Sequence, residues 1–290
     1  MPVTTTVTTR DGRTLAVYEE GDQSGLPTLV HHGTPMAGIQ YGPHVELARE
    51  QGLRLIGYDR PGYGRSTRAP GRRVADCVDD VHAIADALGL ERFATWGISG
   101  GGPHALACAA LCDDRLIATA SLAAVAPFEA EGLDWFDGMG EGNHVEFGKL
   151  TEGEDALRAF CEEQVADRHG PEDLLEALAT LLGPEDRAVL TGRLAEYMIE
   201  CEQHGLALGV DGWVDDDIAF CEPWGFGVAE ISTPVLLLHG DDDRFVPVAH
   251  GRWLAERIPR VETRIDPSDG HLTLLERRMR EVNEWLLSHS

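Results

Sequence analysis

A serine placed for nucleophilic chemistry stands in the middle of the pentapeptide Gly97-Ile98-Ser99-Gly100-Gly101. The apolar run Phe93–Ile98 precedes it and a helical stretch follows, so Ser99 is expected on a tight turn between a strand and a helix. Such a turn needs small flanking residues because its backbone is crowded. The helix N-terminus behind it favours the negative charge that develops when a carbonyl is attacked. A serine hydroxyl also needs a base, and the base needs an orienting acid.

Two polar loops further along the chain offer these partners. The first, Asp241-Asp242-Asp243, follows the apolar run that ends at Gly240, and the second presents the single histidine His271 after the last predicted strand. Ligands in open α/β sheets bind at the carboxyl ends of the parallel strands. We therefore expect Ser99, one of the three aspartates and His271 to meet there. On composition alone, any of the three aspartates could be the acid.

The elements that must position these residues alternate between strand and helix. The runs near Leu29, Leu55 and Ala94 are apolar on successive residues, as expected of strands covered on both faces of a parallel sheet. Alternation of this kind implies right-handed crossovers and a mostly parallel sheet. The predicted strands are Thr14–Glu19, Thr28–His32, Leu53–Tyr58, Phe93–Ile98, Leu116–Val125, Pro234–Gly240 and Val261–Asp266, and the predicted helices are Val74–Leu88, Gly100–Leu111, Ala249–Ile258 and Leu275–Ser288.

The alternation stops for about a hundred residues in the middle of the chain. Residues 128–230 read as helical and contain 26 acidic and 5 basic residues. We therefore predict an α/β core domain of residues 1–127 and 231–290, interrupted by an acidic helical insertion of residues 128–230.

Five motifs of the chain belong together: His32-Gly33-Thr34-Pro35, Asp59-Arg60-Pro61-Gly62-Tyr63-Gly64-Arg65-Ser66, Gly97-Ile98-Ser99-Gly100-Gly101, His239-Gly240-Asp241-Asp242-Asp243 and Gly270-His271. In these motifs the chain resembles capped serine hydrolases of the α/β-hydrolase fold superfamily, of the esterase and proline iminopeptidase type. This resemblance implies an eight-stranded, mostly parallel sheet flanked by helices, with the insertion forming a helical cap over the site.

The resemblance also assigns roles to particular residues. In the family the acid is the third residue after a His-Gly pair, which indicates Asp243. The oxyanion hole would use the N–H of Gly100, directly after the nucleophile, and that of Thr34. In the cap, Trp135 and Phe136 are the best candidates for lining the substrate pocket.

The function that this site implies is hydrolysis of a small neutral carboxylic ester through an acyl intermediate on Ser99, without a cofactor. One alternative is a proline iminopeptidase-like aminopeptidase, in which cap carboxylates hold the substrate amine. A second is a catalytically silent protein that only binds a ligand. Cleavage of a carbon–carbon bond by the same machinery is a third.

Charge and composition limit the partners. The 290 residues contain 50 acidic and 24 basic residues, a net charge of −26 that would repel nucleic acid, anionic membranes and phosphate-rich carriers such as coenzyme A. We therefore expect a small-molecule substrate, with no nucleic acid and no membrane partner. The acidity is equally compatible with a salty cytoplasm or a coding bias, and the sequence carries no information on the oligomeric state.

The remaining features of the sequence bear on metal binding and on the cellular compartment. None of the six cysteines forms a Cys-x-x-Cys pair, so we expect buried, reduced thiols and no metal site. The neighbouring His31 and His32 are expected to be hydrogen-bonded at a strand end rather than to ligate a metal. The polar N-terminus and the absence of a long apolar run predict a soluble, cytoplasmic protein.

Overall fold

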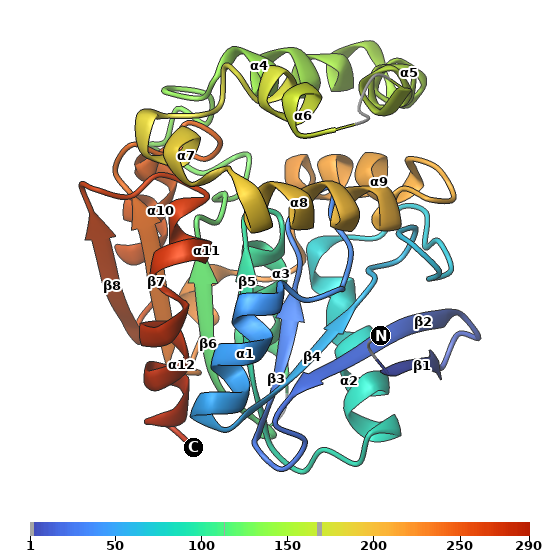
Figure 1. The fold of residues 1–290 in the computed structure, drawn as a ribbon, viewed down its shortest axis with the longest axis vertical. Coiled ribbons are helices and arrows are strands. Elements are labelled where there is room, and N and C mark those ends of the chain that lie inside the picture. Colours follow the sequence, from blue (N-terminus) through green and yellow to red (C-terminus); the bar gives the residue numbers. More distant parts are fainter. Residues whose placement is uncertain (1–2, 113, 167–169) are drawn as a thin grey trace.

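The centre of the molecule is a single eight-stranded sheet. The computed structural model describes residues 3–112, 114–166 and 170–290. The strands lie in the order β1-β2-β4-β3-β5-β6-β7-β8 (Figure 1). Strand β2 pairs antiparallel with β1 and β4, and the remaining pairs are parallel, which confirms the predicted fold class. The strands are β1 (Val3–Thr8), β2 (Thr14–Gly21), β3 (Leu26–His31), β4 (Leu53–Tyr58), β5 (Phe93–Ile98), β6 (Leu116–Leu122), β7 (Val235–Gly240) and β8 (Val261–Asp266).

Strand β1 and helix α1 (Gly42–Gln51) were not among the predicted elements. Strand β1 is a threonine-rich edge strand that pairs only with β2, so it needs no apolar run and relies on the β-branched side chains that suit a strand. The C-terminal helix expected over Leu275–Ser288 is divided at Arg278 into α11 (Thr273–Arg277) and α12 (Met279–Leu287).

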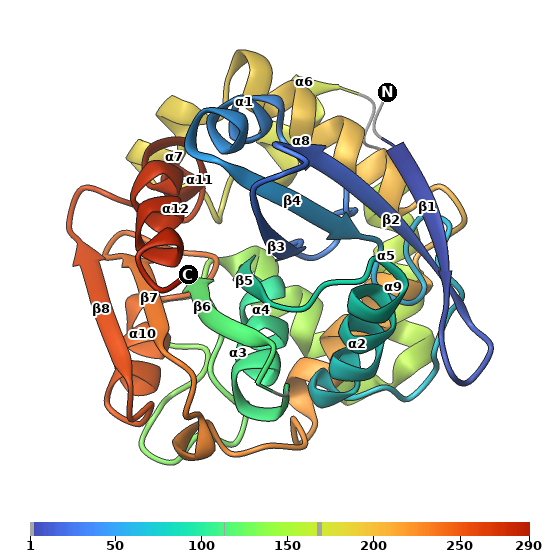
Figure 2. The same ribbon diagram turned by 90° about the horizontal axis from the view of Figure 1, so that it is seen from below.

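Helices cover both faces of the sheet, as Figure 2 shows along the strands. Helices α1 and α12 pack on one face, and α2 (Cys77–Ala87), α3 (Gly101–Leu111) and α10 (Val248–Ala255) pack on the other. The central strands β5, β6 and β7 are buried at every residue. This explains why their sequences are apolar on successive residues.

The chain between β6 and β7 forms a set of helices beyond the carboxyl ends of the parallel strands (Figure 1). We call α4 to α9 the inserted helices; the division of the chain into domains at residues 128 and 230 stays a prediction. Among the described residues, no helix combines the length and the apolar character needed to cross a membrane. The inserted helices are α4 (Glu141–Gly148), α5 (Glu154–Ala166), α6 (Pro171–Ala177), α7 (Pro184–Val189), α8 (Gly192–Gly205) and α9 (Asp211–Cys221).

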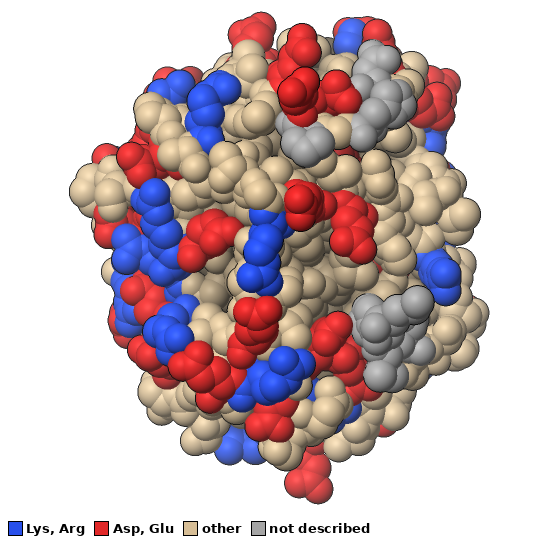
Figure 3. Space-filling view, viewed as in Figure 1, with Lys and Arg blue, Asp and Glu red and all other residues tan. Residues whose placement is uncertain are grey.

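The charge is unevenly spread over the surface in Figure 3. Over the inserted helices acidic side chains outnumber basic ones, whereas acids and arginines alternate over the C-terminal helices. Arg277 pairs there with Glu185 at 2.8 Å, and Arg280 with Glu50 at 3.2 Å. The arginines of the core are thus largely neutralised by neighbouring acids.

Candidate active site

Ser99 lies on the turn between β5 and α3 in a conformation that non-glycine residues rarely adopt, with φ of 54°. The flanking glycines allow this turn by close backbone contact. A Cβ on Gly97 would lie 2.2 Å from the carbonyl oxygen of Gly101, and a Cβ on Gly101 would lie 2.1 Å from that of His31. The turn therefore tolerates no side chain at either position, and it presents Ser99 at the carboxyl edge of the sheet.

His271 and Asp243 come from the loops after β8 and β7 and are joined directly. The Nδ1 of His271 donates to Oδ2 of Asp243 at 2.7 Å, and the other carboxylate oxygen accepts from the backbone N–H groups of Phe245 and Val246. Of the three consecutive aspartates, Asp243 is thus the one that holds the histidine. Asp241 pairs instead with Arg252 at 2.7 Å.

Electrostatics favour the protonated form of this histidine. Burial lowers the pKa of the His271 imidazole, but the charge and hydrogen bond of Asp243 outweigh it, so that the pKa is raised above 6.5. The ring of Phe245 stacks on that of His271 with centroids 4.5 Å apart, which fixes the imidazole plane. The pair can therefore take up a proton at Nε2 and hold it as an imidazolium ion.

The loop that carries His271 is held from the inserted helices by a residue that sequence reasoning missed. Asp186 on α7 is completely buried and accepts the backbone N–H groups of His271 at 2.8 Å, Leu272 at 2.7 Å and Thr273 at 3.1 Å. Burial raises the pKa of its carboxyl, and the hydrogen bond from His271 opposes that rise. No motif surrounds Asp186; its partners lie 85 to 87 residues further along the chain.

Thr34 lies after β3, beside Ser99 and Gly100. The Cβ position of Gly100 is 2.3 Å from the hydroxyl oxygen of Thr34, so this side chain rests directly on the Gly100 backbone. In the part of the chain that the structure describes, neither the Thr34 N–H nor the Gly100 N–H donates to another protein group. Two amides without a protein acceptor beside a serine hydroxyl can bind a carbonyl oxygen as it gains negative charge.

Thr34 is also tied to a buried ionic cluster, which sequence reasoning missed as well. Its hydroxyl donates to Oδ2 of Asp216 on α9 at 2.6 Å. Asp216 also forms ion pairs with Arg60 at 2.5 Å and with Arg72 at 2.6 Å. Burial raises the pKa of the Asp216 carboxyl, but the charges of Arg60 and Arg72 outweigh it and hold the pKa well below its usual value. Asp216 is therefore an anion, and Arg60, which belongs to the motif Asp59–Ser66, is one of its two arginine partners.

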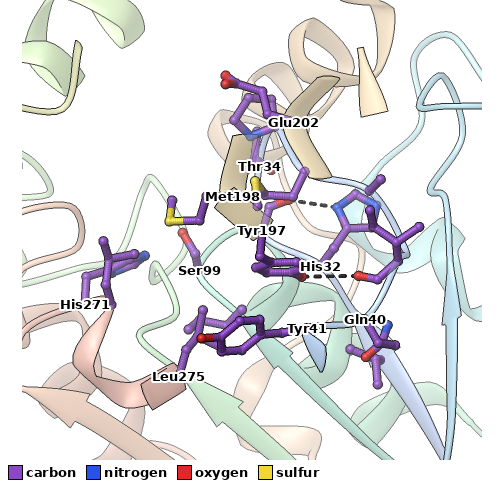
Figure 4. Close-up of a pocket in the computed structure, with 18 of the residues that line it drawn as sticks. His32, Thr34, Gln40, Tyr41, Ser99, Tyr197, Met198, Glu202, His271 and Leu275 are labelled. Atoms are coloured by element: carbon purple, nitrogen blue, oxygen red, sulfur yellow. Dashed lines mark hydrogen bonds between the residues drawn. The ribbon is translucent and has the colours of Figure 1, made fainter. Parts of the chain in front are cut away.

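Ser99 lies where two cavities meet. The first, of about 120 Å³, is mostly apolar, and in Figure 4 Ser99 and His271 face it together, with Met198 beside them. It runs between the core and helix α8, and both Tyr41 and Tyr197 line it. Its apolar lining suits an uncharged fragment of a substrate.

The second cavity, of about 130 Å³, lies under α4, α5 and α9 and has a polar end. Ser99, Thr34 and Gly100 line it, and so do Glu146 and Asp217. The indole of Trp213 donates to Glu146 at 2.6 Å. Among the described residues, Oδ2 of the buried Asp217 has no hydrogen-bond partner.

The two acids of this cavity interact with each other. Burial raises the pKa of the Asp217 carboxyl well above its usual value, and the negative charge of Glu146 adds to that rise. The wall of the second cavity thus offers carboxyl oxygens to a hydrogen-bond donor.

Trp135 and Phe136, proposed from sequence as pocket residues, line neither of these two cavities. The Trp135 indole N–H donates to the Ala126 carbonyl at 2.9 Å, and its ring packs against His250 with centroids 5.4 Å apart. These aromatics close the joint between the end of β6 and α10, where large rings fill the core. Phe147 and Phe220, from α4 and α9, line the second cavity instead.

The two neighbouring histidines are occupied by protein partners. His31 is fully buried, and its Nδ1 lies 3.2 Å from the Tyr58 hydroxyl; burial lowers its pKa to about 3. The Nδ1 of His32 donates to the Gly33 carbonyl at 2.8 Å, and its Nε2 accepts the Arg60 backbone N–H at 3.2 Å. Within the described ranges, no cluster of three or more His, Cys, Asp or Glu residues is arranged to hold a metal ion.

Comparison with known proteins finds relatives with different named activities. A non-heme chloroperoxidase of Streptomyces lividans is 32% identical over 123 residues, but the match spans only 42% of this chain and 45% of that protein. A bifunctional esterase/perhydrolase of Acinetobacter calcoaceticus is 25% identical over 259 residues, with 83% of each chain covered.

Solved structures share the fold over the whole chain. An esterase from Thermogutta terrifontis superposes with a TM-score of 0.71 at 24% identity and covers 99% of this chain and 100% of that one. A proline iminopeptidase from Mycobacterium smegmatis gives 0.67 at 22% identity, with 99% and 98% covered. The sequence model of the alpha/beta hydrolase fold matches residues 27–278. Because that match takes in most of the chain, the protein belongs to the alpha/beta hydrolase fold family.

Proposed function

We propose that this protein is a serine hydrolase that cleaves a small neutral carboxylic ester through an acyl intermediate on Ser99. The observation that carries the proposal is the His271–Asp243 pair, which faces the same cavity as a serine on a strained strand-to-helix turn. The esterase/perhydrolase relative, similar over most of its length, supports the same chemistry.

The proposed reaction depends on proton transfer between Ser99, His271 and the leaving group. His271 Nε2 takes the proton of Ser99 as its oxygen bonds to the ester carbon, while Asp243 holds the Nδ1 proton. The carbonyl oxygen, now an anion, binds to the N–H groups of Thr34 and Gly100. His271 then gives its proton to the leaving alcohol as the carbon–oxygen bond breaks, which leaves the acyl group on Ser99. A water molecule attacks this acyl group while His271 takes its proton. The proton then returns to the Ser99 oxygen as the acid is released.

The two cavities suggest which part of the ester goes where. His271 lines the first cavity and not the second, whereas Gly100 lines the second and not the first. The leaving oxygen must reach His271, and the carbonyl oxygen must reach Gly100. We therefore place the alcohol part in the apolar first cavity and the acyl part in the second.

The test is hydrolysis of p-nitrophenyl esters from acetate to long acyl chains. We expect wild-type turnover with an optimum at short chains, because the second cavity is small, and loss of turnover in Ser99→Ala with an unchanged circular dichroism spectrum. Comparable turnover by the Ser99→Ala protein would contradict the proposal. A fluorophosphonate that fails to label Ser99 would instead favour a protein that binds a ligand without turning it over.

The acids of the second cavity favour one other candidate, an aminopeptidase of the proline iminopeptidase type. A protonated amine on the acyl part would find Glu146 and Asp217 at the polar end of that cavity. The test sets L-proline p-nitroanilide beside the p-nitrophenyl esters. Turnover of the anilide, with weak turnover of the esters, would support this candidate, and no turnover of the anilide would exclude it.

A further inference from the structure

We infer that helix α9 positions the oxyanion site from outside the sheet, with Asp216 and Arg60 holding the side chain of Thr34 so that its N–H stays directed toward the space beside Ser99. We call His32–Thr34 the oxyanion loop. The inference rests on the proposed function, because that function gives the Thr34 N–H its role. It makes Asp216 and Arg60 positioning residues, since they act through Thr34 and touch no reacting atom.

The loop is held at both of its ends. Arg60 donates from its guanidinium to the His32 carbonyl, and its backbone N–H reaches His32 Nε2 at 3.2 Å. At the other end, the Thr34 hydroxyl donates to Asp216 at 2.6 Å and accepts from Arg60 at 3.2 Å. The same guanidinium thus contacts the first and last residues of the loop, and Asp216 closes the arrangement.

Both partners of the Thr34 side chain are buried and paired with opposite charges. Arg60 and Asp216 are both completely buried, and their ion pair is backed by a second ion pair from Arg72 to Asp216. A hydrogen bond from a hydroxyl to a buried, ionised carboxylate is short and strong. Thr34 is therefore anchored to a fixed point and not to another mobile loop.

The position of the Thr34 side chain matters because it lies in close contact with the Gly100 backbone. The hydroxyl oxygen rests on the Gly100 backbone, at the place where a Cβ would stand. The contact sets the spacing between the two amides that face the same space. Oxyanion donors act only within a narrow range of distances, so a displaced Thr34 would bind the transition state less well and the ground state almost equally.

The experiment compares two variants that each remove one hydroxyl donor from the same carboxylate oxygen of Asp216. Thr34→Val removes the 2.6 Å bond that anchors the loop, and the matched control Tyr63→Phe removes the 2.8 Å bond that does not. With p-nitrophenyl acetate, we expect kcat to fall about tenfold to a hundredfold in Thr34→Val with KM within about threefold. In Tyr63→Phe we expect kcat within about twofold of wild type, at a similar loss of thermal stability.

A second measurement tests the oxyanion site directly. A trifluoromethyl ketone forms a tetrahedral adduct on the serine, with a negative oxygen in the oxyanion site. Its affinity should fall in Thr34→Val by about the same factor as kcat and stay unchanged in Tyr63→Phe. A role in stability alone would move neither quantity in this selective way. The variant Asp216→Asn is a poorer probe, because it leaves two buried arginines without their anion and endangers folding.

The outcomes separate the inference from the proposed function. An active wild type with equal kcat in both variants, or equal ketone affinity in both, overturns the inference alone. A wild-type protein that neither turns over esters nor labels at Ser99 removes the proposed function, and the inference falls with it. A selective loss of kcat and of ketone affinity in Thr34→Val supports both.

Discussion

Substitution of Asp186 by Asn is expected to lower the free energy of unfolding by about 2–4 kcal/mol, although the side chain keeps its size. The carboxylate is completely buried; one oxygen accepts from Leu272 and Thr273 and the other from His271. An amide has one acceptor oxygen. If that oxygen stays with Leu272 and Thr273, the new NH₂ group faces the His271 N–H, and two buried donors are left without acceptors.

Each such donor costs about 1–3 kcal/mol, and the neutral amide recovers part of the cost of burying a charge, which gives the range above. The neighbouring residue provides a matched control. Glu185 lies on the same helix and pairs with Arg277 at 2.8 Å, but its side chain is 46% exposed, so Glu185→Gln should cost less than about 1 kcal/mol.

The measurement is urea unfolding of both variants and the wild type, followed by circular dichroism, with the slopes of the transitions compared to confirm that the same surface is exposed. The inserted helices and the His271 loop would then be shown to depend on one buried carboxylate. Equal stability of Asp186→Asn and Glu185→Gln would refute the reasoning, since it would mean that the three backbone hydrogen bonds contribute no more than an exposed ion pair.

Two further predictions concern pH and backbone packing. Burial lowers the pKa of His271 and Asp243 raises it above 6.5 overall, so kcat/KM for an ester should rise with pH through a value above 6.5 as the neutral base forms. In Asp243→Asn this limb should move to lower pH while kcat falls by about 10⁴, and a pH–rate profile with an unmoved limb would contradict the assignment. Gly101→Ala should destabilise the protein by about 3 kcal/mol or more, because its Cβ would lie 2.1 Å from the His31 carbonyl oxygen. Gly148→Ala, with open space around the Cβ position, is the control for thermal unfolding, and equal melting temperatures would show that the turn can relax.

Most of the sheet could be predicted from sequence because buried parallel strands consist of short runs of apolar residues. The buried strands β4 and β5 begin and end as predicted. The elements that escaped have weaker signals. The edge strand β1 buries little, and α1 carries polar and apolar residues with little separation between its faces.

The residues of the candidate site also differ in how clearly the sequence indicates them. Ser99, Asp243 and His271 follow strands within a few residues, so their placement at one edge of the sheet can be predicted from the topology. Asp186 and Asp216 lie on inserted helices, and their partners are 85 and 182 residues away in the sequence. Nothing local distinguishes these two acids from the other acidic residues of that segment. Trp135 follows a strand end closely in the sequence, yet its ring packs against His250 and lines neither cavity.

The buried ion pair between Arg60 and Asp216 has a consequence for the order in which the chain folds. Arg60 belongs to the first α/β half and is completely inaccessible to solvent, yet the carboxylate that neutralises it is made 156 residues later. During synthesis from the N-terminus, an early sheet must leave this guanidinium hydrated, because a buried charge without its partner is too costly. Arg60 can therefore be buried only once α9 is present. A chain that ends before this helix could not complete the packing around Arg60.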